Sequence, residues 1–493
     1  MKALLVYPEF LGKTFWGFKY AIRFVGKEAA HPPLGLPTIA PFLFYEGWEL
    51  KLVDMNIEKL RDKDIMAVDY VFISAMISQS ESVREIIKRC KKLNVKIVAG
   101  GPLFTSMPEE FNDVDHLVLN EAEITLPIFM DDLRKGETKH SYSSTKWAEM
   151  SKSPVPRFDL LNMKEYASMN VQYSRGCPND CDFCNVTVLY GHKPRTKTAA
   201  QIIAELESLY RLGWRGSVFI VDDNFIGNKT KLKAEILPAF IKWSEARRFP
   251  FNFFTEADIG LADDENLMSL MVQAGFDSVF IGIESPNKES LEECNKIPNK
   301  NRDLIASVKK IQRAGLEVQG GFIVGFDSDP DSIFDTTINF IQESRIGTAM
   351  VGLLNALSGT KLYQRLKNEG RLVSSTSGNN TDFSINFIPK MDKQKLIEGY
   401  RRVVNTIYSP KNYYERVRNF LKDSGPLRKR SYNLNRIGAG VKSIFRLGII
   451  GRERVQYWKL LFWTLFKRPG LLSHSITSAI FGFHFRKVFE KQK

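Results

Sequence analysis

Three cysteines lie close together near the middle of the sequence, in the run SRGCPNDCDFC that begins at Ser174. Thiolates at this spacing on one loop can bind three irons of a cubane 4Fe–4S cluster and leave the fourth iron without a protein ligand. A catalytic metal centre needs such an open position, whereas a structural centre has none. Cys177, Cys181 and Cys184 are therefore the predicted catalytic and metal-binding residues.

Two structural alternatives use the same three cysteines, either as a zinc knuckle or in a cluster with a fourth, remote cysteine. The sequence holds five cysteines, so only Cys90 and Cys294 are left for that role. Such clustering is not the pattern of a disulfide framework and fits a reducing compartment. The first apolar run, Ala3–Tyr7, is too short for a secretory signal, and we expect a cytoplasmic protein.

The elements that would position the cysteine loop repeat along the middle of the chain, where short apolar runs alternate with amphipathic segments. Two of these segments, Ala199–Leu212 and Asp264–Ala274, are followed by glycines, as helix C-caps favour. Six such units predict a partial (βα)6, TIM-like barrel over residues 166–375, with its site at the carboxyl ends of the strands. The expected strands are 169–173, 217–221, 251–255, 278–283, 317–324 and 349–354.

Residues 1–135 show an earlier alternation of the same kind, which predicts a parallel, doubly wound, Rossmann-like α/β domain. Ligands of such sheets bind beyond the carboxyl ends of the strands. Gly100 and Gly101 directly follow a strand and would let a ligand approach the backbone closely. The expected strands are 3–7, 49–53, 70–75, 96–99 and 116–119.

The remaining segments differ in composition from both series. Residues 136–165 are expected to be a linker, because a polar stretch is followed by the stiff Pro154-Val155-Pro156. Residues 376–493 predict a mostly helical, basic C-terminal domain. From Arg401 onward there are 21 Lys and Arg against 4 Asp and Glu, whereas the preceding 400 residues hold 49 against 52. The excess charge is therefore local, and nucleic acid is not an expected partner of the catalytic body.

The cysteine loop, with an aromatic residue before its last cysteine and a place at the first strand of a partial barrel, resembles the radical S-adenosylmethionine (SAM) superfamily. The resemblance implies that SAM chelates the open iron and is cleaved reductively to a 5′-deoxyadenosyl radical. It also implies an external electron donor of the flavodoxin or ferredoxin type. Each acidic residue at a strand end has an alternative role as a helix N-cap. The implied SAM contacts are Phe183, Asp223, Glu256, Glu284, Ser285, Ile323 and Gly325.

A Rossmann-like domain before such a barrel resembles the cobalamin-dependent subclass of that superfamily. The implied cobalamin contacts are Asn56, Ser74, Gly100, Gly101 and Glu121. The usual base-off cobalamin loop reads Asp-x-His-x-x-Gly, and here Asn56 occupies the histidine position, so this loop offers no histidine to cobalt. Many members of the subclass share that feature. The alternative is a vestigial domain that binds no cobalamin.

Together these resemblances imply cobalamin-dependent methyl transfer to an unactivated carbon of a lipid or other hydrophobic substrate. The alternative is another radical SAM reaction, namely C–C bond formation, cyclisation or oxidation, with a vestigial first domain. A third interpretation, a non-enzymatic cluster or cobalamin sensor, does not explain the polar groups at so many strand ends.

The basic C-terminal segment resembles the extension on the branch that includes hopanoid methylases. Aromatic residues beside Lys and Arg suit an anionic membrane surface, so we expect contact with the inner membrane face. The alternatives are solvated helix faces that cap the barrel, with Trp458 and Trp463 in the core, and RNA binding. The absence of a second cysteine trio counts against RNA binding. The aromatic residues considered are Tyr408, Tyr413, Tyr414, Tyr457 and Trp458.

Overall fold

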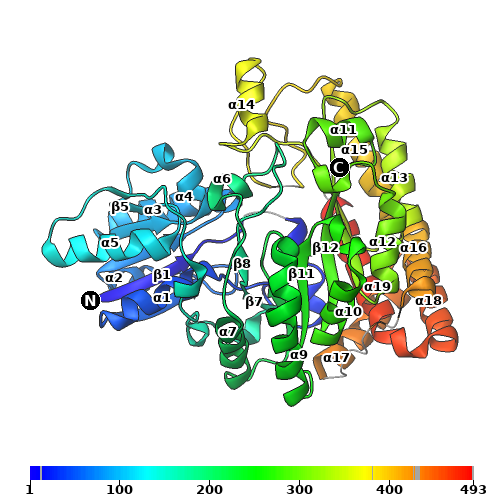
Figure 1. Cartoon of the computed structure of the whole chain (residues 1–493), viewed down its shortest axis with the longest axis horizontal. Helices are drawn as coiled ribbons and strands as arrows, with labels where there is room; N and C mark the ends of the chain where they lie inside the picture. Colours follow the sequence, from blue (N-terminus) through cyan, green and yellow to red (C-terminus); the bar gives the residue numbers. More distant parts are fainter. Residues whose placement is uncertain (11–13, 380, 426, 428–433, 491–493) are drawn as a thin grey trace.

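The structure is a computed structural model that describes all residues except 11–13, 380, 426, 428–433 and 491–493. Figure 1 shows a first α/β unit in blue and cyan, a second in green, and a helical C-terminal part in yellow to red. Each α/β unit holds one six-stranded parallel sheet. In the described part of the chain, no helix combines the length and the apolar character needed to cross a membrane.

The first sheet is wound in both directions from its centre, with strand order β2-β1-β3-β4-β5-β6. Helices cover both faces, which explains why its strands are continuous apolar runs. Leu5 of β1 belongs to the large core, while Leu4 and Val6 belong to a separate core on the other face. The expected Rossmann-like fold is therefore confirmed. The strands are β1 (Lys2–Tyr7), β2 (Glu49–Asp54), β3 (Tyr70–Ser74), β4 (Lys96–Gly100), β5 (His116–Val118) and β6 (Ser141–Tyr142); the helices are α1 (Gly35–Tyr45), α2 (Asp62–Met66), α3 (Ser80–Lys92), α4 (Pro102–Ser106) and α5 (Ala122–Lys135).

The last strand of this sheet, β6, lies inside the segment that the sequence predicts as a linker. Its two residues pair in parallel with β5, and Tyr142 is buried. Further along, the backbone N–H of Arg157 donates to the carbonyl of Pro37 in α1. Residues 136–165 therefore differ from a free linker, since part of the segment completes the first sheet and part packs against it.

The second sheet has the strand order β7-β10-β11-β12-β13-β14, with every pair parallel and with β7 and β14 at its two edges rather than paired to each other. Helices between the strands cover its outer face, and the expected partial barrel of six units is confirmed. The strands are β7 (Ser168–Val171), β10 (Gly216–Ile220), β11 (Phe251–Ala257), β12 (Phe276–Glu284), β13 (Glu317–Val324) and β14 (Ala349–Leu353); the main covering helices are α7 (Ala199–Arg211), α9 (Leu237–Ala246), α10 (Glu265–Ala274), α12 (Leu304–Arg313) and α13 (Ile333–Ser344).

The first barrel strand is shorter than the expected 169–173. β7 ends at Val171, and a two-residue strand, β8 (Ser174–Arg175), pairs antiparallel with β9 (Arg195–Thr196). Two acceptor oxygens of Asp222 bend the chain here, because they bind the backbone N–H groups of Tyr173 and Ser174 at 2.8 and 2.7 Å. The β8–β9 ribbon joins the two ends of the cysteine loop.

The C-terminal helices cap the β14 edge of the barrel. The Tyr408 hydroxyl donates to the Ala349 carbonyl (2.7 Å), and Arg416 Nε donates to the Ile346 carbonyl (2.7 Å). Helix α15 packs on α13, and α19 packs on α16 and α18. The described helices are α14 (Lys361–Asn368), α15 (Lys393–Ile407), α16 (Pro410–Asp423), α17 (Leu434–Ser443), which continues as the π-helix η12 (Ile444–Ile449), α18 (Arg454–Lys467) and α19 (Leu472–Glu490).

The tyrosines that the sequence suggests as membrane-facing are core residues instead. Tyr408, Tyr413, Tyr414 and Tyr457 are each at most 2% exposed. The hydroxyl groups of Tyr408, Tyr413 and Tyr457 reach polar partners inside the fold, as buried tyrosines usually do. For these residues the alternative of helices that cap the barrel is the one the structure shows.

The β7 edge is closed by the first domain. Ala29 forms a parallel bridge with Tyr166, and the carbonyls of Ala29 and Ala30 accept hydrogen bonds from the backbone of Ala167 and Ser168. The chain after residue 27 therefore adds an extended segment beside β7. This contact fixes the first domain next to the barrel, so that the carboxyl ends of both sheets can serve one site.

Candidate active site

The cysteine loop runs from β8 to the short helix α6 (Val186–Tyr190) and is held by backbone hydrogen bonds. The N–H of Cys177 donates to the Gly191 carbonyl at 3.2 Å, and the N–H of Asp182 donates to the Cys294 carbonyl at 3.0 Å. Gly176 has φ +94°, and a Cβ there would lie 2.7 Å from the Lys193 carbonyl. Only glycine fits that position, so the conformation of the loop depends on Gly176.

The three thiols of the loop lie in a shielded, electrostatically coupled group. Burial raises the pKa of all three, to about 11 for Cys181 and about 12 for Cys184. Negative charge on Cys177 contributes to the raised pKa of Cys181, and charge on Cys181 contributes to that of Cys184. A bound metal cluster relieves this repulsion, because its irons stabilise thiolates. The trio therefore fits a 4Fe–4S cluster.

The two other cysteines occupy different surroundings. Cys90 is buried in the second core of the first domain. Cys294 lies next to the loop, but its Sγ points to the Leu291 carbonyl, 3.7 Å away. Among the described residues, no three His, Cys, Asp or Glu side chains surround a single metal-ion position. In a cubane each thiolate binds its own iron, so the trio does not need to converge on one ion.

Asp222 and Asp223 follow β10 and have different roles. Asp222 is buried, and its carboxylate accepts the Ser174 hydroxyl (2.6 Å) in addition to the two backbone N–H groups that bend the chain. Asp223 is half-buried, and burial raises its pKa to about 6. No hydrogen bond or ion pair from another described side chain reaches the Asp223 carboxylate. It is therefore available to a ligand, as the SAM resemblance implies.

An acidic rim with one buried cation lies at the ends of β11 and β12. Burial first, and then the nearby charges of Asp223 and Glu284, raise the pKa of Glu256 to about 8. Lys296 is 9% exposed, and its Nζ lies 2.8 Å from Glu284 Oε1. Despite desolvation, the neighbouring Glu284 and Cys181 keep the pKa of Lys296 raised. The structure thus brings predicted SAM contacts together with a lysine that the sequence analysis does not name.

The end of β12 also carries an unsatisfied amide. Asn299 is buried, and its Nδ2 donates to the carbonyls of Gly282 (3.0 Å) and Ile283 (2.8 Å). Its Oδ1 is buried and has no hydrogen-bond partner. A buried acceptor without a partner is costly, and a hydroxyl or amino group of a bound ligand would satisfy it. Ser285, the predicted contact beside it, accepts the N–H of Asn287 (3.1 Å).

The end of β13 meets the cysteine loop through aromatic rings. Phe183 packs edge-on against Phe326, with ring centroids 6.3 Å apart. Gly325 has φ +109°, and its N–H donates to Asp329 Oδ2 at 2.7 Å. Ile323 is half-buried on the same strand. Phe183 therefore lies next to the chain that follows Gly325, and SAM contact by Phe183, Ile323 and Gly325 remains a prediction.

The predicted cobalamin contacts of β3 and β4 form a glycine cradle. A Cβ on Gly101, which has φ +93°, would lie 2.8 Å from Ser74 Oγ, and a Cβ on Gly35 would lie 3.5 Å from the same atom. A Cβ on Gly100 would lie 2.6 Å from the Val118 carbonyl. Glycine at 100 and 101 lets the chain pass close to Ser74 and Val118 at the carboxyl edge of the sheet, which is the edge where ligands of such sheets bind. This edge faces the cysteine loop, since α4 contacts α6.

Asn56 is held inside the first domain. Its Oδ1 accepts the N–H of Phe10 (3.0 Å), and its Nδ2 donates to the Pro8 carbonyl (3.1 Å) and to Asp54 Oδ1 (2.7 Å). Asp54 in turn accepts the Tyr166 hydroxyl at 2.7 Å. Asn56 thus fixes the loops after β1 and β2, and a contact with cobalamin remains a prediction.

Glu121 belongs to a buried ion-pair network between the two domains. Its Oε1 lies 2.8 Å from Arg175 Nη1, and its Oε2 lies 2.8 Å from Arg195 Nη1. Glu123 pairs with Arg175 at 3.0 Å. The arginines belong to β8 and β9, the ribbon at the base of the cysteine loop. Cobalamin contact by Glu121 remains a prediction, whereas its side chain demonstrably joins the first domain to that ribbon.

The inner face of the barrel is aromatic below the acidic rim. Phe219 and Phe254 are paired on β10 and β11, and their rings stack 4.7 Å apart. Phe280 is paired with Glu256 and meets Trp16 from the first domain, with centroids 5.2 Å apart. All four aromatic residues are half-buried, and His31 of the first domain lies beside the stacked pair, 5.5 Å from Phe219 and 6.0 Å from Phe254 between ring centroids. The surface below the rim is suited to an apolar molecule.

Known proteins resemble this chain in both domain order and sequence. Residues 27–130 match the B12 binding domain, residues 171–341 match the radical SAM superfamily, and residues 360–493 match a domain of unknown function, DUF4070. The "uncharacterized methyltransferase sll1242" of Synechocystis is 42% identical and covers 99% of this chain and 92% of its own length. The hopanoid C-2 methylase of Rhodopseudomonas palustris is 30% identical, with 93% and 88% covered.

A solved structure shares the fold. The radical SAM methyltransferase TsrM from Kitasatospora setae, solved with cobalamin and a [4Fe–4S] cluster bound, has a TM-score of 0.63 and 16% identity. The match covers 81% of this chain and 84% of that one. The domain order and the relatives that match over nearly the whole chain agree with the site geometry. The chain therefore belongs to the family of cobalamin-dependent radical SAM methyltransferases.

Proposed function

We propose that this protein transfers a methyl group from SAM, by way of cobalamin, to an unactivated carbon of a hydrophobic, lipid-type substrate. The observation that best supports this proposal is that three features meet at one site. They are a buried cysteine trio, an acidic rim that includes a buried acceptor without a hydrogen-bond partner, and a glycine cradle that faces the same loop. When bound, the cluster with SAM supplies a radical that removes hydrogen from carbon, and cobalamin supplies the methyl group. The relatives named as methyltransferases do not favour the alternative of another radical reaction with a vestigial first domain.

The rim residues bind and orient SAM in this proposal. The Lys296 ammonium offers a cation to a carboxylate of the ligand, and Asp223 and Glu256 offer acceptors to its amino group. Asn299 Oδ1 accepts one ribose hydroxyl. Lys296 and Asn299 are fixed by hydrogen bonds to the end of β12, and Asp223 and Glu256 are shielded at strand ends, so the rim holds the ligand with little reorganisation.

The first domain holds cobalamin on the glycine cradle in this proposal. Gly101→Ala tests it, because the new Cβ would press on Ser74 Oγ and strain the backbone at φ +93°. Gly136→Ala is the matched control, since that glycine also has positive φ but nothing lies within 4 Å of its Cβ. Cobalt-corrin absorbance of the reconstituted protein should disappear in the first variant and persist in the second. Equal cobalamin content in both variants would show that the glycine cradle does not bind cobalamin.

The aromatic inner face supports a hydrophobic substrate. The stacked Phe219 and Phe254, with Phe280 and Trp16 beside them, offer apolar surface directly below the rim where the radical would form. The hopanoid C-2 methylase relative is named for a lipid-type substrate. Comparing lipid extracts of host cells with and without the gene tests the assignment. A methylated lipid present only with the gene supports it, and identical lipid extracts contradict it.

The proposal also includes partners and a location. Reductive cleavage of SAM needs one electron from outside, for which we propose a flavodoxin or ferredoxin type donor. A lipid substrate places the enzyme in the cytoplasm at the inner membrane face. Reconstitution with reduced flavodoxin should give SAM cleavage, and its failure where a chemical reductant succeeds would exclude that donor.

A further inference from the structure

An exposed apolar surface covers one side of the C-terminal helices. Phe466 is 77% exposed, Phe445 is 59% exposed and Phe462 is 52% exposed. Soluble helices usually turn such residues inward, and exposed patches of this kind mark an interaction site. We call it the C-terminal apolar surface; its members are Phe445, Ile449, Ile450, Val455, Phe462, Leu465 and Phe466.

The members come from η12, from Ile450 directly after it, and from the neighbouring helix α18. Trp458 links them: its Nε1 donates to the Gly448 carbonyl at 3.0 Å, and its ring stacks on Phe462 at 5.4 Å. On α18 the exposed members recur at helical spacing along one face. The opposite face carries Tyr457, Leu460 and Thr464, which are buried. Helix α18 is therefore apolar toward the core, and toward the solvent it carries apolar side chains with Lys459 among them.

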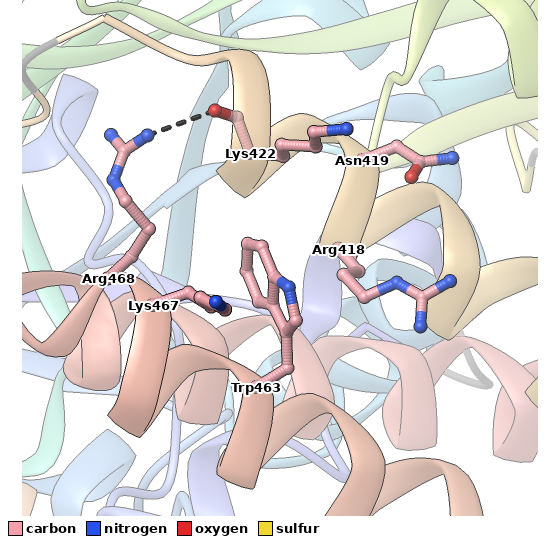
Figure 2. Close-up of a pocket in the computed structure, with 6 residues that line it drawn as sticks. All are labelled: Arg418, Asn419, Lys422, Trp463, Lys467 and Arg468. Carbon is pink, nitrogen blue, oxygen red and sulfur yellow. Dashed lines mark hydrogen bonds between the residues drawn. The ribbon is translucent and has the colours of Figure 1, made fainter.

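A cationic hollow flanks this surface, between α16 and α18. Figure 2 shows Trp463 rising from α18 toward α16, with Arg418 and Lys422 on the facing helix. Lys467 and Arg468 complete the rim of a space of about 450 Å³. Its lining contains no carboxylate, and none of these four cations forms an ion pair with a described residue. Arg468 binds the Lys422 carbonyl at 3.0 Å, which fixes one side of the hollow.

The positive charge of the C-terminal region indicates which kind of partner could bind there. The sequence from Arg401 onward has 21 Lys and Arg against 4 Asp and Glu. Three of the four acids are already paired: Asp423 with Arg345, Glu453 with Arg486, and Glu490 with Lys487. A second copy of this chain would bring the same positive charge against this face, so self-association is opposed by repulsion. An anionic lipid bilayer offers negative headgroups and an apolar interior together.

We propose that the C-terminal apolar surface docks the enzyme on an anionic bilayer, with its apolar side chains in the interface and phospholipid headgroups in the cationic hollow. This inference rests on the proposed function, since a lipid-type substrate has to be taken from the bilayer. It goes further by assigning a surface and a lipid charge to the DUF4070 segment, which spans residues 360–493. The aromatic residues that carry it differ from the buried tyrosines considered from the sequence.

Co-sedimentation with vesicles tests the proposal on the full chain. We expect binding to vesicles of phosphatidylcholine and phosphatidylglycerol in equal parts, and none to phosphatidylcholine alone. Salt should weaken binding, because it screens exposed charges. Trp463 and Trp458 should shift their fluorescence to shorter wavelength on binding. Equal binding to both kinds of vesicle, or to neither, overturns the proposal.

Matched variants separate this surface from the rest of the molecule. Phe462→Ser and Phe466→Ser should each lower the partition coefficient roughly tenfold or more, because an aromatic side chain no longer enters the interface. Arg418→Gln and Lys467→Gln should each lower it about fivefold. Tyr45→Ser and Lys88→Gln are the controls, since both residues are exposed in the first domain. Controls that lose as much binding as the C-terminal variants overturn the proposal.

Failure here and failure of the proposed function give different results. Vesicle binding is measured without SAM or substrate, and methyl transfer is measured with substrate in detergent micelles. Variants that lose vesicle binding should keep methyl transfer in micelles. Sedimentation analysis of the wild-type chain should show a monomer, and an oligomer that Phe466→Ser dissociates would identify a second copy as the occupant and overturn the proposal.

Discussion

At the scale of single residues, the site depends on thiols whose ionisation the protein alone disfavours. Burial raises the pKa of Cys177, Cys181 and Cys184, so a bound cationic cluster has to stabilise the thiolates. The spacing of these residues on a glycine-shaped loop made them predictable from the sequence. Cluster binding and loop conformation are thus encoded together in a short run of residues.

Replacing one cysteine of the trio should abolish cluster binding, because three thiolates are the full ligand set in this account. Cys181→Ala should lose iron and SAM cleavage after reconstitution. Cys294→Ala is the matched control, since its Sγ points to the Leu291 carbonyl although it lies beside the loop. Iron content and visible absorbance measure cluster binding in both variants. Loss of iron in the control variant would point to four protein ligands and so contradict an open iron.

The sequence did not reveal Lys296 or Asn299. Both follow α11 (Lys288–Glu293), Lys296 in irregular chain and Asn299 in the short 3-10 helix η11 (Ile297–Asn299), where a lysine or an asparagine ordinarily faces solvent. Only the packing of this segment on β12 buries them beside Glu284. The spacing of residues in a sequence can predict site residues that share one loop. It cannot predict site residues that only tertiary structure brings together.

Lys296→Met should weaken SAM binding at least tenfold, because the rim loses its cation. It should also lower the free energy of unfolding by about 3 kcal/mol, since Glu284 is left buried and unpaired. The double variant Lys296→Met/Glu284→Gln should recover stability without recovering SAM affinity. Calorimetric titration and thermal unfolding measure the two effects. A double variant that binds SAM like the wild type would assign Lys296 a purely structural role.

At the scale of elements, the alternation of apolar runs predicted most strands of both sheets to within a few residues. The exceptions are two-residue strands: β6, β8 and β9. A period of two cannot be recognised in two residues, and these strands form because neighbours fix them. Asp222 bends the chain into β8, and β5 offers an edge to β6. The ribbon β8–β9 then carries the arginines that bind the first domain.

Glu121→Gln should loosen the two domains, because it leaves Arg175 and Arg195 without a full counter-charge in a buried contact. We expect a loss of about 3 kcal/mol in the free energy of unfolding. Methyl transfer should fall more than SAM cleavage, since only transfer needs both domains in register. Glu110→Gln is the control, an exposed partner of Arg84 in the same domain. Equal losses of both activities would show that Glu121 acts on the barrel alone.

At the scale of the whole molecule, the two ends of the chain pack together beside the barrel. Phe15 stacks on Phe485 at 4.4 Å, and His484 Nδ1 accepts the N–H of Tyr20 at 3.4 Å. Trp16, in the same stretch, reaches Phe280 inside the barrel. A single sequence gives no signal for contacts over such separations. The contact between the two chain ends therefore could not be predicted, although the C-terminal helices and their place beside the barrel were among the interpretations of the sequence.

Acid should weaken this packing through His484. Burial lowers the pKa of its imidazole from 6.5 to about 4. Between these values the unfolded chain binds more protons than the folded one, so stability falls as pH falls from about 6.5 to about 4. In that window, His484→Gln should reduce the slope of the unfolding free energy against pH by up to about 1.4 kcal/mol per pH unit. The His484→Gln variant should still lose some stability as the pH falls, because the pKa of His31 is also lowered to about 4.

Chemical denaturation at a series of pH values measures this slope for both proteins. Above about pH 6.5 the curves of stability against pH should run parallel, because the imidazole is neutral in both states. Parallel curves below that value as well would show that His484 does not report on the packing of the chain ends.

The central claim is that both domains serve one reaction in which SAM methyl reaches carbon through cobalamin. The most direct measurement is mass spectrometry of products formed from SAM with a deuterated methyl group, by cluster-reconstituted enzyme with and without cobalamin. The account predicts 5′-deoxyadenosine in both reactions, and a product with the labelled methyl group only when cobalamin is present. Labelled product without cobalamin, or 5′-deoxyadenosine without any methyl transfer when cobalamin is bound, would contradict it.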